Sequence, residues 1–155
     1  MVPQERIKII KDGKTKSNIS KALSVKLSFQ ENSVTIEGEG IELFQAKSIV
    51  KAIGRGFSPE NAFRLLKEDE TLETIELNQF NDSRMRIIKS RVIGTGGKTW
   101  KMIEKCSGCS LSVYGKTVSL IGNYEQLNIA REAVQMVIRG SKHSKVYGFL
   151  FQAAG

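Results

Sequence analysis

The sequence predicts an α+β protein made of two copies of one small domain, each with a three-stranded antiparallel sheet covered by helices. Two observations predict this fold class. The 155-residue chain aligns with itself at an offset of 84 residues without a gap. Within the second copy, the hydrophobic pattern changes between the two-residue period of strands and the 3.6-residue period of helices. We place the two domains at residues 1–70 and 71–155.

The 84-residue repeat consists mainly of matched apolar positions. These pairs include Ile19 with Ile103, Leu27 with Leu111, Val34 with Val118, Ile36 with Leu120, Leu43 with Leu127, Ala46 with Ala130 and Val50 with Val134. The two copies therefore share a core more than a surface, and duplication of one domain is the simplest interpretation.

A connector helix is predicted between the copies. Ser58 can cap its first turn, Pro59 suits the first helical position, and the helix is expected to run to Lys67. After it, residues 72–80 alternate like a strand. The pattern thus predicts a structured link and not a flexible one.

The remaining elements of the second copy follow in order. Residues 85–93 have apolar side chains at helical spacing, and a glycine-rich loop then leads into a short helix that ends at Ser107-Gly108. Residues 111–113 and 118–120 alternate around a tight turn at 114–116, which predicts an antiparallel hairpin. Asn123 caps a final helix that runs to Gly140. The predicted order is β-α-α-β-β-α.

The net charge of +8 favours a polyanionic partner. Residues 1–80 contain 12 Lys and Arg against 12 Asp and Glu, whereas residues 81–155 contain 12 against 4, so the whole excess lies after residue 80. This division predicts a nucleic-acid-binding half and a neutral half. No window approaches the roughly 18 apolar residues that span a bilayer, and we expect a cytoplasmic protein.

Residues 93–113 carry the most specific motif. Ile93-Gly94-Thr95-Gly96-Gly97-Lys98-Thr99-Trp100-Lys101-Met102-Ile103 precedes a small-residue turn and Leu111-Ser112-Val113. Glycines let the backbone approach a phosphate closely, and Gly97 opens a helix whose unpaired amides and positive dipole end favour an anion. The segment resembles the core of a type I K-homology (KH) domain, from which only the bulky Trp100 departs. The resemblance implies two tandem KH domains.

A KH groove holds about four unpaired nucleotides, with the glycine loop on their backbone. The predicted RNA-binding residues are the loop Gly94, Thr95, Gly96 and Gly97, an apolar platform of Ile93, Ile103, Leu111 and Val113, and a basic rim of Lys89, Arg91, Lys98, Lys101 and Lys116. The alternative is that Ile103, Leu111 and Val113 belong to the core. The position of Trp100 also favours the core over base stacking.

Rival motifs fail on spacing. A nucleotide-binding P-loop needs a glycine where Val92 stands, and a dinucleotide fingerprint needs one at Thr99. Cys106 and Cys109 could form half of a zinc site, but His143 is the only histidine that could join them. We interpret both cysteines as reduced packing residues, with a redox role as the alternative. We expect no enzymatic activity, which excludes a nuclease or nucleotide hydrolase, and no cofactor or metal.

The loop of the first copy is degenerate. The offset of 84 places Ile10-Lys11-Asp12-Gly13 at the positions of Gly94–Gly97. The first glycine is lost, and Asp12 would put a negative charge where a phosphate would lie. The first domain is therefore expected to keep the fold, lose the clamp and serve a structural or protein-binding role.

Three stretches resemble the archaeal members of the partner-of-Nob-one (Dim-two) family of ribosome-assembly factors. They are Gly56-Phe57-Ser58-Pro59-Glu60-Asn61-Ala62, the Gly94 loop with Gly97-Lys98-Thr99, and Gly140-Ser141 with Ser144-Lys145-Val146-Tyr147-Gly148. The resemblance extends from about Arg6 to the end of the chain.

This resemblance implies a single-stranded RNA-binding protein of small ribosomal subunit biogenesis. It implies binding to the 3′ region of small-subunit (pre-)rRNA and assistance in its maturation, as well as contact with the Nob endonuclease and with the alpha subunit of archaeal initiation factor two. An alternative is a protein-protein adaptor in ribosome assembly or translation initiation, whose KH fold is mainly a scaffold. We expect a monomer.

Overall fold

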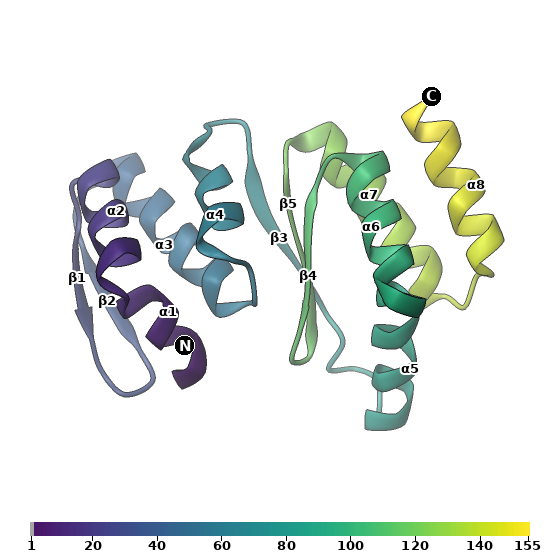
Figure 1. Ribbon diagram of the computed structural model, residues 1–155, viewed down its shortest axis with the longest axis horizontal. Coiled ribbons are helices and arrows are strands. Elements are labelled where there is room, and N and C mark those ends of the chain that lie inside the picture. Colours follow the sequence, from purple (N-terminus) through teal and green to yellow (C-terminus); the bar gives the residue numbers. More distant parts are fainter. Residues whose placement is uncertain (1) are drawn as a thin grey trace. The chain divides into compact units, whose positions relative to one another are not determined.

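The computed structural model describes residues 2–155, and the chain divides into two compact units, Met1–Glu68 and Asp69–Gly155. Each unit contains one small antiparallel sheet, with its helices on one face of that sheet (Figure 1). The prediction of an α+β fold with small antiparallel sheets is confirmed. None of the helices in residues 2–155 has the length and apolar composition needed to cross a bilayer.

The second unit has the predicted element order followed by one further helix. Its elements are β3 (Thr71–Glu76), α5 (Asp82–Ile93), the 3-10 turn η2 (Thr95–Gly97), α6 (Lys98–Ser107), β4 (Ser110–Tyr114), β5 (Thr117–Gly122), α7 (Tyr124–Ile138) and α8 (His143–Ala154). The sheet order is β3-β5-β4, so β5 is central. The strand predicted over residues 72–80 ends at Glu76, because the Phe80 N–H donates to the Leu77 carbonyl and closes a turn (3.1 Å).

Side-chain caps begin two of these helices. The Asn81 side chain accepts the Arg84 N–H at the start of α5 (2.8 Å). At α7, Asn123 and Gln126 form a reciprocal capping box, each side chain accepting the other's backbone N–H at 2.9 Å. These bonds satisfy backbone amides that the first turn of each helix leaves unpaired, and they therefore fix where each helix begins.

The core of the second unit lies between the sheet and the helices. Its fully buried side chains include Leu77, Val92, Ile103, Val118, Leu120, Val134, Val137, Val146 and Leu150. Since α5, α6 and α8 all contribute to this core, the glycine loop between α5 and α6 projects from a rigid base.

The first unit contains seven elements. They are α1 (Gln4–Lys11), α2 (Gly13–Leu23), β1 (Lys26–Phe29), β2 (Val34–Glu37), α3 (Gly40–Gly54), α4 (Pro59–Ala62) and the 3-10 turn η1 (Phe63–Leu66). Its sheet has two strands within residues 2–68, so the prediction of three strands in each domain is wrong for this unit. In this part of the chain β2 pairs with β1 alone, from Val34 opposite Phe29 to Glu37 opposite Lys26.

The predicted connector helix forms, but in two parts. The Ser58 hydroxyl accepts the Asn61 N–H (3.2 Å) and Pro59 opens α4, as expected from the sequence. From Phe63 the backbone tightens into η1, and the chain leaves the helix at Lys67. Both parts belong to the first unit, where Ala62 and Leu65 are buried.

The C-terminal segment forms a further helix, α8, which the predicted order β-α-α-β-β-α does not include. α8 packs beside α6 and α7, with Val146 and Leu150 fully buried (Figure 1). Gly140 ends α7 as predicted, and Ser141-Lys142 then reverse the chain. The four-residue spacing of Val146 and Leu150 is the signal that indicates this helix.

Candidate nucleic-acid interface

The loop between α5 and α6 has a backbone conformation that favours glycine at three positions. Gly94, Gly96 and Gly97 have φ angles of 76°, 62° and 77°, in the region that L side chains rarely adopt. Gly94 ends α5 and Gly97 begins α6. The motif therefore specifies a particular turn, and not only a flexible segment.

Gly94 is also held by a close contact. A Cβ atom at this position would lie 2.4 Å from the Thr99 Oγ1 and 2.8 Å from the Thr99 backbone nitrogen. The Thr99 side chain is buried, and its hydroxyl forms a hydrogen bond with the Tyr147 hydroxyl of α8 (2.9 Å). The loop is thus packed against α6, and α8 supports it from behind.

Gly96 and Gly97 instead face open space. No heavy atom would lie within 4 Å of a Cβ at either position. Gly97 is the N-cap of α6 and has no side chain to accept the first amides of that helix. The Lys98 N–H donates to the Thr95 carbonyl within η2. The positive end of the helix dipole, with no side chain covering it, faces an anion that approaches the loop.

Three lysines of α6 lie around this point. Lys98, Lys101 and Lys105 are exposed, and together with Gly96 and Met102 they line a depression of about 290 Å³. Lys98 and Lys101 are among the predicted site residues. Lys105 is not, although its four-residue spacing from Lys101 would have indicated it. A phosphate in this depression would meet both the helix amides and several ammonium groups.

The other predicted cations take different positions. Lys89 is half-buried, and its ammonium group donates to the Gly115 carbonyl at 2.7 Å, which ties α5 to the β4–β5 turn. Lys116 is exposed on the same turn. A second depression of about 390 Å³ lies along α5, lined by Asp82, Met85, Arg86, Lys89, Ser90 and Ile93. Arg86 is exposed there and is absent from the predicted set.

Arg91 does not lie on the basic rim. Its guanidinium group is part-buried and donates to the Val137 carbonyl (3.1 Å) and to the Ser141 carbonyl. It therefore caps the C-terminal end of α7, where a cation also complements the helix dipole. Arg91 thus has a structural contact within the second unit, and its contact with RNA stays a prediction.

The predicted apolar platform divides into two pairs. Ile103 and Leu111 are 0% and 3% exposed, so their side chains belong to the core, as the alternative interpretation holds. Ile93 and Val113 are partly exposed, and Val113 packs on that core from outside. Trp100 is likewise only partly buried against the core. The surface that bases could contact is accordingly smaller than predicted.

The charge asymmetry between the halves depends on where the chain is divided. Residues 1–68 carry 12 Lys and Arg against 8 Asp and Glu, and residues 69–155 carry 12 against 8, so each unit has a net charge of +4. The prediction of one neutral and one basic domain is therefore wrong. The excess of positive charge is concentrated in one part of the second unit instead. Residues 83–124, which contain the loop, carry 8 Lys and Arg and one acid, Glu104, a net charge of +7.

The first unit has no such loop. α1 ends at Lys11, α2 begins at Gly13, and the single residue between them, Asp12, has φ −51° and ψ 130°. Ile10, the counterpart of Gly94, is fully buried within α1. Of the two helix-turn-helix segments in residues 2–155, the second alone has the clamp conformation.

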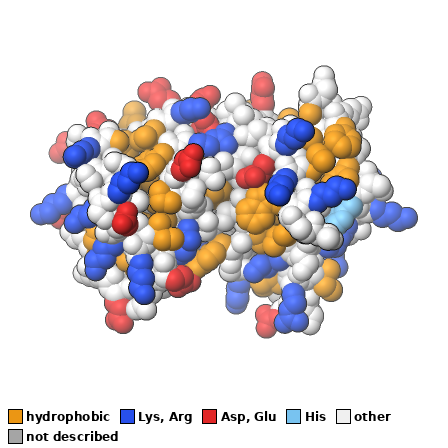
Figure 2. Space-filling view, in the orientation of Figure 1, with side chains coloured by type: hydrophobic (Ala, Val, Ile, Leu, Met, Phe, Trp, Pro, Cys, Tyr) orange, Lys and Arg blue, Asp and Glu red, His pale blue; other side chains and the backbone are white. Residues whose placement is uncertain are grey.

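An aromatic cluster on α8 adjoins the loop. The Lys98 ammonium lies 5.8 Å from the centre of the Tyr147 ring, and His143 stacks on that ring at 6.0 Å. A ring nitrogen of His143 is also 3.1 Å from the Arg91 carbonyl oxygen. Lys and Arg side chains lie next to this single histidine in Figure 2. His143 is thus half-buried among these side chains.

The cysteines and acids form no chemical centre in the described structure. Cys106 and Cys109 are not joined by a disulfide, and Cys109 is buried. Within residues 2–155, no group of three His, Cys, Asp or Glu side chains could hold a metal ion. The Glu104 carboxylate accepts a hydrogen bond from the Leu111 N–H (2.9 Å), so this acid has a structural contact.

Known proteins match both the sequence and the structure. A model of the second KH domain of PNO1 proteins, described as a eukaryotic type KH domain (KH-domain type I), matches residues 71–154. A KH domain-containing protein of Methanocaldococcus jannaschii is 40% identical over 159 residues, which cover 96% of this chain and 70% of that protein. The pre-rRNA-processing protein PNO1 of Phaeosphaeria nodorum is 32% identical over 117 residues, and the match covers 73% of this chain but 45% of the relative's length.

Two crystal structures from Pyrococcus horikoshii OT3 have the same fold. Dim2p matches with a TM-score of 0.88 and 43% identity, covering 97% of this chain and 95% of its own. A complex of a/eIF2alpha, aDim2p and rRNA matches with a TM-score of 0.91 and 41% identity, covering 99% and 90%. With the family model matching more than half of the residues, the chain belongs to the PNO1/Dim2 family of type I KH-domain proteins.

Proposed function

We propose that this protein binds single-stranded RNA through the glycine loop of its second unit, and that it acts in small ribosomal subunit biogenesis. Its RNA would be the 3′ region of small-subunit (pre-)rRNA, and its role would be to assist maturation. The set Gly94, Thr95, Gly96, Gly97, Lys98 and Lys101, extended by Lys105, would contact the sugar-phosphate backbone.

The observation that carries this proposal is the geometry at the start of α6. Three glycines in left-handed conformations open a helix without a side-chain cap, and three exposed lysines surround the opening. Such an arrangement suits a flexible chain of phosphates, because close backbone approach and positive charge coincide. Ile93 and Val113, which are partly exposed, would contact bases.

The relatives support the choice of RNA and of process. PNO1 proteins are named as pre-rRNA-processing and as RNA-binding proteins, and the Pyrococcus complex contains rRNA and a/eIF2alpha. By analogy, the alpha subunit of archaeal initiation factor two is a proposed partner. The Nob endonuclease is a second one, which rests on the family resemblance. We propose a cytoplasmic binding protein that holds RNA without cutting it.

A protein-adaptor function fits the first unit best. This unit lacks the clamp conformation, and the Pyrococcus complex contains a protein beside the RNA. Residues 1–70 would then form a degenerate KH domain with a structural or protein-binding role. Residues 71–155 would form the domain that binds RNA.

The test compares Gly96→Asp with Gly96→Asn. Gly96 has φ 62° and open space around it, and Asp and Asn both tolerate this conformation, so the two variants differ by one negative charge. A charge about 5 Å from a phosphate is worth up to about 3 kcal/mol of repulsion at an effective dielectric constant of about 20. We expect the Asp variant to bind at least about tenfold more weakly than the Asn variant.

The measurement is fluorescence anisotropy with a labelled oligonucleotide that matches an archaeal small-subunit rRNA 3′ end. An unrelated oligonucleotide of equal length reports specificity. Equal thermal midpoints for the two variants would show that both fold alike. Equal RNA affinities of Asp and Asn variants would exclude the glycine loop as the phosphate contact.

A further inference from the structure

Gly148 lies in the middle of α8, where no feature of the fold calls for a glycine. Its φ angle is outside the left-handed region, and no heavy atom lies within 4 Å of the place that a Cβ would take. Glycine inside a helix is less favourable than alanine, because it has more conformational freedom to lose. Neither a turn nor packing within the chain explains this residue, whereas close approach of another molecule to the helix backbone would.

An exposed aromatic ring lies next to this bare backbone. Phe151 follows Gly148 by three residues on the same side of α8, and it is 57% exposed. Helical side chains lean toward the N-terminus of their helix, so Phe151 leans toward the turn that contains Gly148. Its ring centre is 6.5 Å from that of the partly exposed Tyr147. We call the surface of Tyr147, Gly148 and Phe151 the aromatic shelf.

Tyr147 is fixed from two sides. Its hydroxyl group forms the 2.9 Å hydrogen bond with the Thr99 hydroxyl group of α6. The ring of His143 stacks on it one turn earlier in α8, with 6.0 Å between the ring centres and 15° between the ring planes. This part of the aromatic shelf is therefore pre-organised, and a ligand that stacks there costs little side-chain entropy of the protein.

Lys98 connects the aromatic shelf to the glycine loop. It is the first residue of α6, directly after Gly97, and its ammonium group lies 5.8 Å from the centre of the Tyr147 ring. The same side chain lines the depression that also contains Gly96 and Lys101. Since α6 and α8 pack side by side (Figure 1), an RNA chain that leaves the loop past Lys98 would reach the aromatic shelf next.

The charge around the aromatic shelf favours a nucleic acid over a protein. Residues 133–155 contain Arg139, Lys142 and Lys145 but no Asp or Glu. An apolar protein segment would fill the shelf without using this charge, whereas a nucleotide offers a flat base and a phosphate together. Aromatic rings beside cations are typical of surfaces that bind single-stranded nucleic acids.

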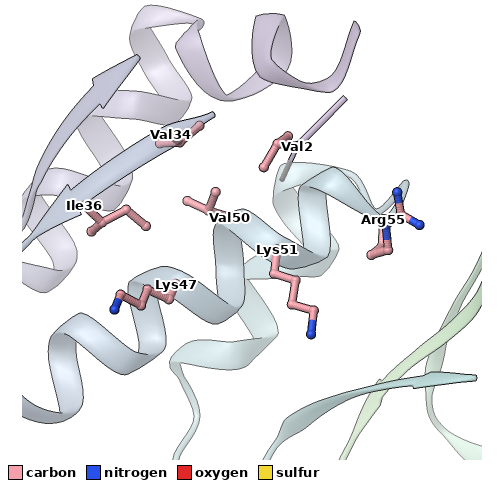
Figure 3. Close-up of a pocket in the computed structure, with 7 residues that line it drawn as sticks. All are labelled: Val2, Val34, Ile36, Lys47, Val50, Lys51 and Arg55. Atoms are coloured by element: carbon pink, nitrogen blue, oxygen red, sulfur yellow. The ribbon is translucent and has the colours of Figure 1, made fainter. Parts of the chain in front are cut away.

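Positive charge is found elsewhere without such rings. In the first unit, a pocket of about 340 Å³ lies between β2 and α3, and Figure 3 shows its lining residues, Val2, Val34, Ile36, Lys47, Val50, Lys51 and Arg55. None of these lining residues is aromatic. A base would find cations there but no ring on which to stack, whereas the aromatic shelf provides both.

We propose that the aromatic shelf binds one unpaired RNA base beyond the roughly four nucleotides that a KH groove holds. The base would lie against the Gly148 backbone and stack on Phe151, and Lys98 would contact a phosphate between the glycine loop and the shelf. α8 is not part of the β-α-α-β-β-α order, so this contact would lengthen the RNA segment that the second unit holds. The inference rests on the proposed binding of RNA by the glycine loop.

The test is an abasic scan with the full chain. The probe is a labelled RNA of about 12 nucleotides that matches an archaeal small-subunit rRNA 3′ end and exceeds the groove at both ends. Each base is removed in turn while its phosphate stays, and binding is measured by fluorescence anisotropy. Loss of the base on the aromatic shelf should weaken binding to the wild-type chain at least about fivefold. The same loss should cost less than about twofold in Phe151→Ala, because the partner ring is already gone.

A second variant covers the aromatic shelf and spares the fold. Gly148→Gln places a long side chain at an exposed helical position with free space, so the thermal midpoint should stay equal or rise. The intact RNA should nevertheless bind at least about fivefold more weakly. Phe44→Ala removes a comparably exposed ring (68%) from α3 and is the matched control, which should leave both the affinity and the abasic scan unchanged.

The two RNA contacts can fail separately. Identical abasic scans for wild type and Phe151→Ala, or wild-type affinity in Gly148→Gln, would overturn the aromatic shelf as an RNA site and favour a protein partner there. Either result would leave the glycine loop unaffected, since Gly96→Asp and Gly96→Asn report on that loop. An RNA that fails to bind the wild-type chain at all would overturn both proposals.

Discussion

The backbone of Gly94 has φ 76° and ψ 170°, a combination that is essentially restricted to glycine. Gly94→Ala would add strain of about 1–3 kcal/mol and a clash with the Thr99 backbone nitrogen. We expect the free energy of unfolding to fall by at least that amount in urea titrations. Gly13→Ala, at the start of α2 with no atom within 4 Å, is the control and should change stability by less than about 1 kcal/mol. Equal losses would contradict the strain argument.

Arg91 and Lys101 are both cations of the second unit, but their contacts assign them different effects. Arg91→Ala removes two hydrogen bonds from a charged group to carbonyls at the end of α7, and we expect a stability loss of about 2–3 kcal/mol. Lys101→Ala, at an exposed site, should change stability by less than about 0.5 kcal/mol but weaken RNA binding about 3–10-fold. Thermal unfolding measures the effect on stability and fluorescence anisotropy the effect on RNA affinity, so the two measurements together distinguish the two roles. A reversed pattern would return Arg91 to the RNA site.

At the scale of elements, α8 supports the loop through one hydroxyl. Tyr147→Phe removes the hydrogen bond to Thr99 but keeps the ring beside Lys98, so it isolates this contact. We expect a stability loss of about 0.5–1.5 kcal/mol and a few-fold weaker RNA binding. Tyr124→Phe, on a side chain that is 76% exposed, should change neither quantity. Unchanged RNA affinity in Tyr147→Phe would show that the loop keeps its shape without α8.

Local signals predict most elements of the second unit, and long-range contacts explain the failures. Asn123 caps a helix where the sequence indicates it, and the glycine spacing locates the clamp. The structural contacts of Arg91 are missed because its carbonyl partners lie 46 and 50 residues away, a distance over which sequence pattern carries no information. α8 is missed because the polar Ser141–Lys145 segment hides the short apolar stripe of Val146 and Leu150.

For the whole molecule, the distribution of charge shows how much depends on domain boundaries. Division at residue 80 assigns Asp69, Glu70, Glu73 and Glu76 to the first half, although the structure places them in the second unit. The net charge of each unit then says nothing about which one binds RNA. The concentration of Lys and Arg in residues 83–124 is informative about RNA binding, because these residues form one continuous part of the fold around the loop.

The salt dependence of RNA binding tests this electrostatic contribution. If three or four phosphates are held, log affinity should fall linearly with log salt concentration with a slope of about −2 to −3. Lys105→Ala should reduce the magnitude of the slope by about 0.7, whereas Lys21→Ala on the first unit should not. The measurement is a titration series from low to high salt. A slope near zero would exclude phosphate contacts as the main source of affinity.

The contact between Gly94 and Thr99, with Tyr147 behind it, has a consequence for the rate of binding. The loop already holds its turn in the RNA-free chain, so its conformational entropy is lost during folding and not on association. Encounter with RNA then needs no slow rearrangement of the protein, and lysine steering can bring association close to the diffusional range. Substitutions at Gly94 or Tyr147 would accordingly slow capture of the RNA, while those at the exposed lysines would alter its dependence on ionic strength.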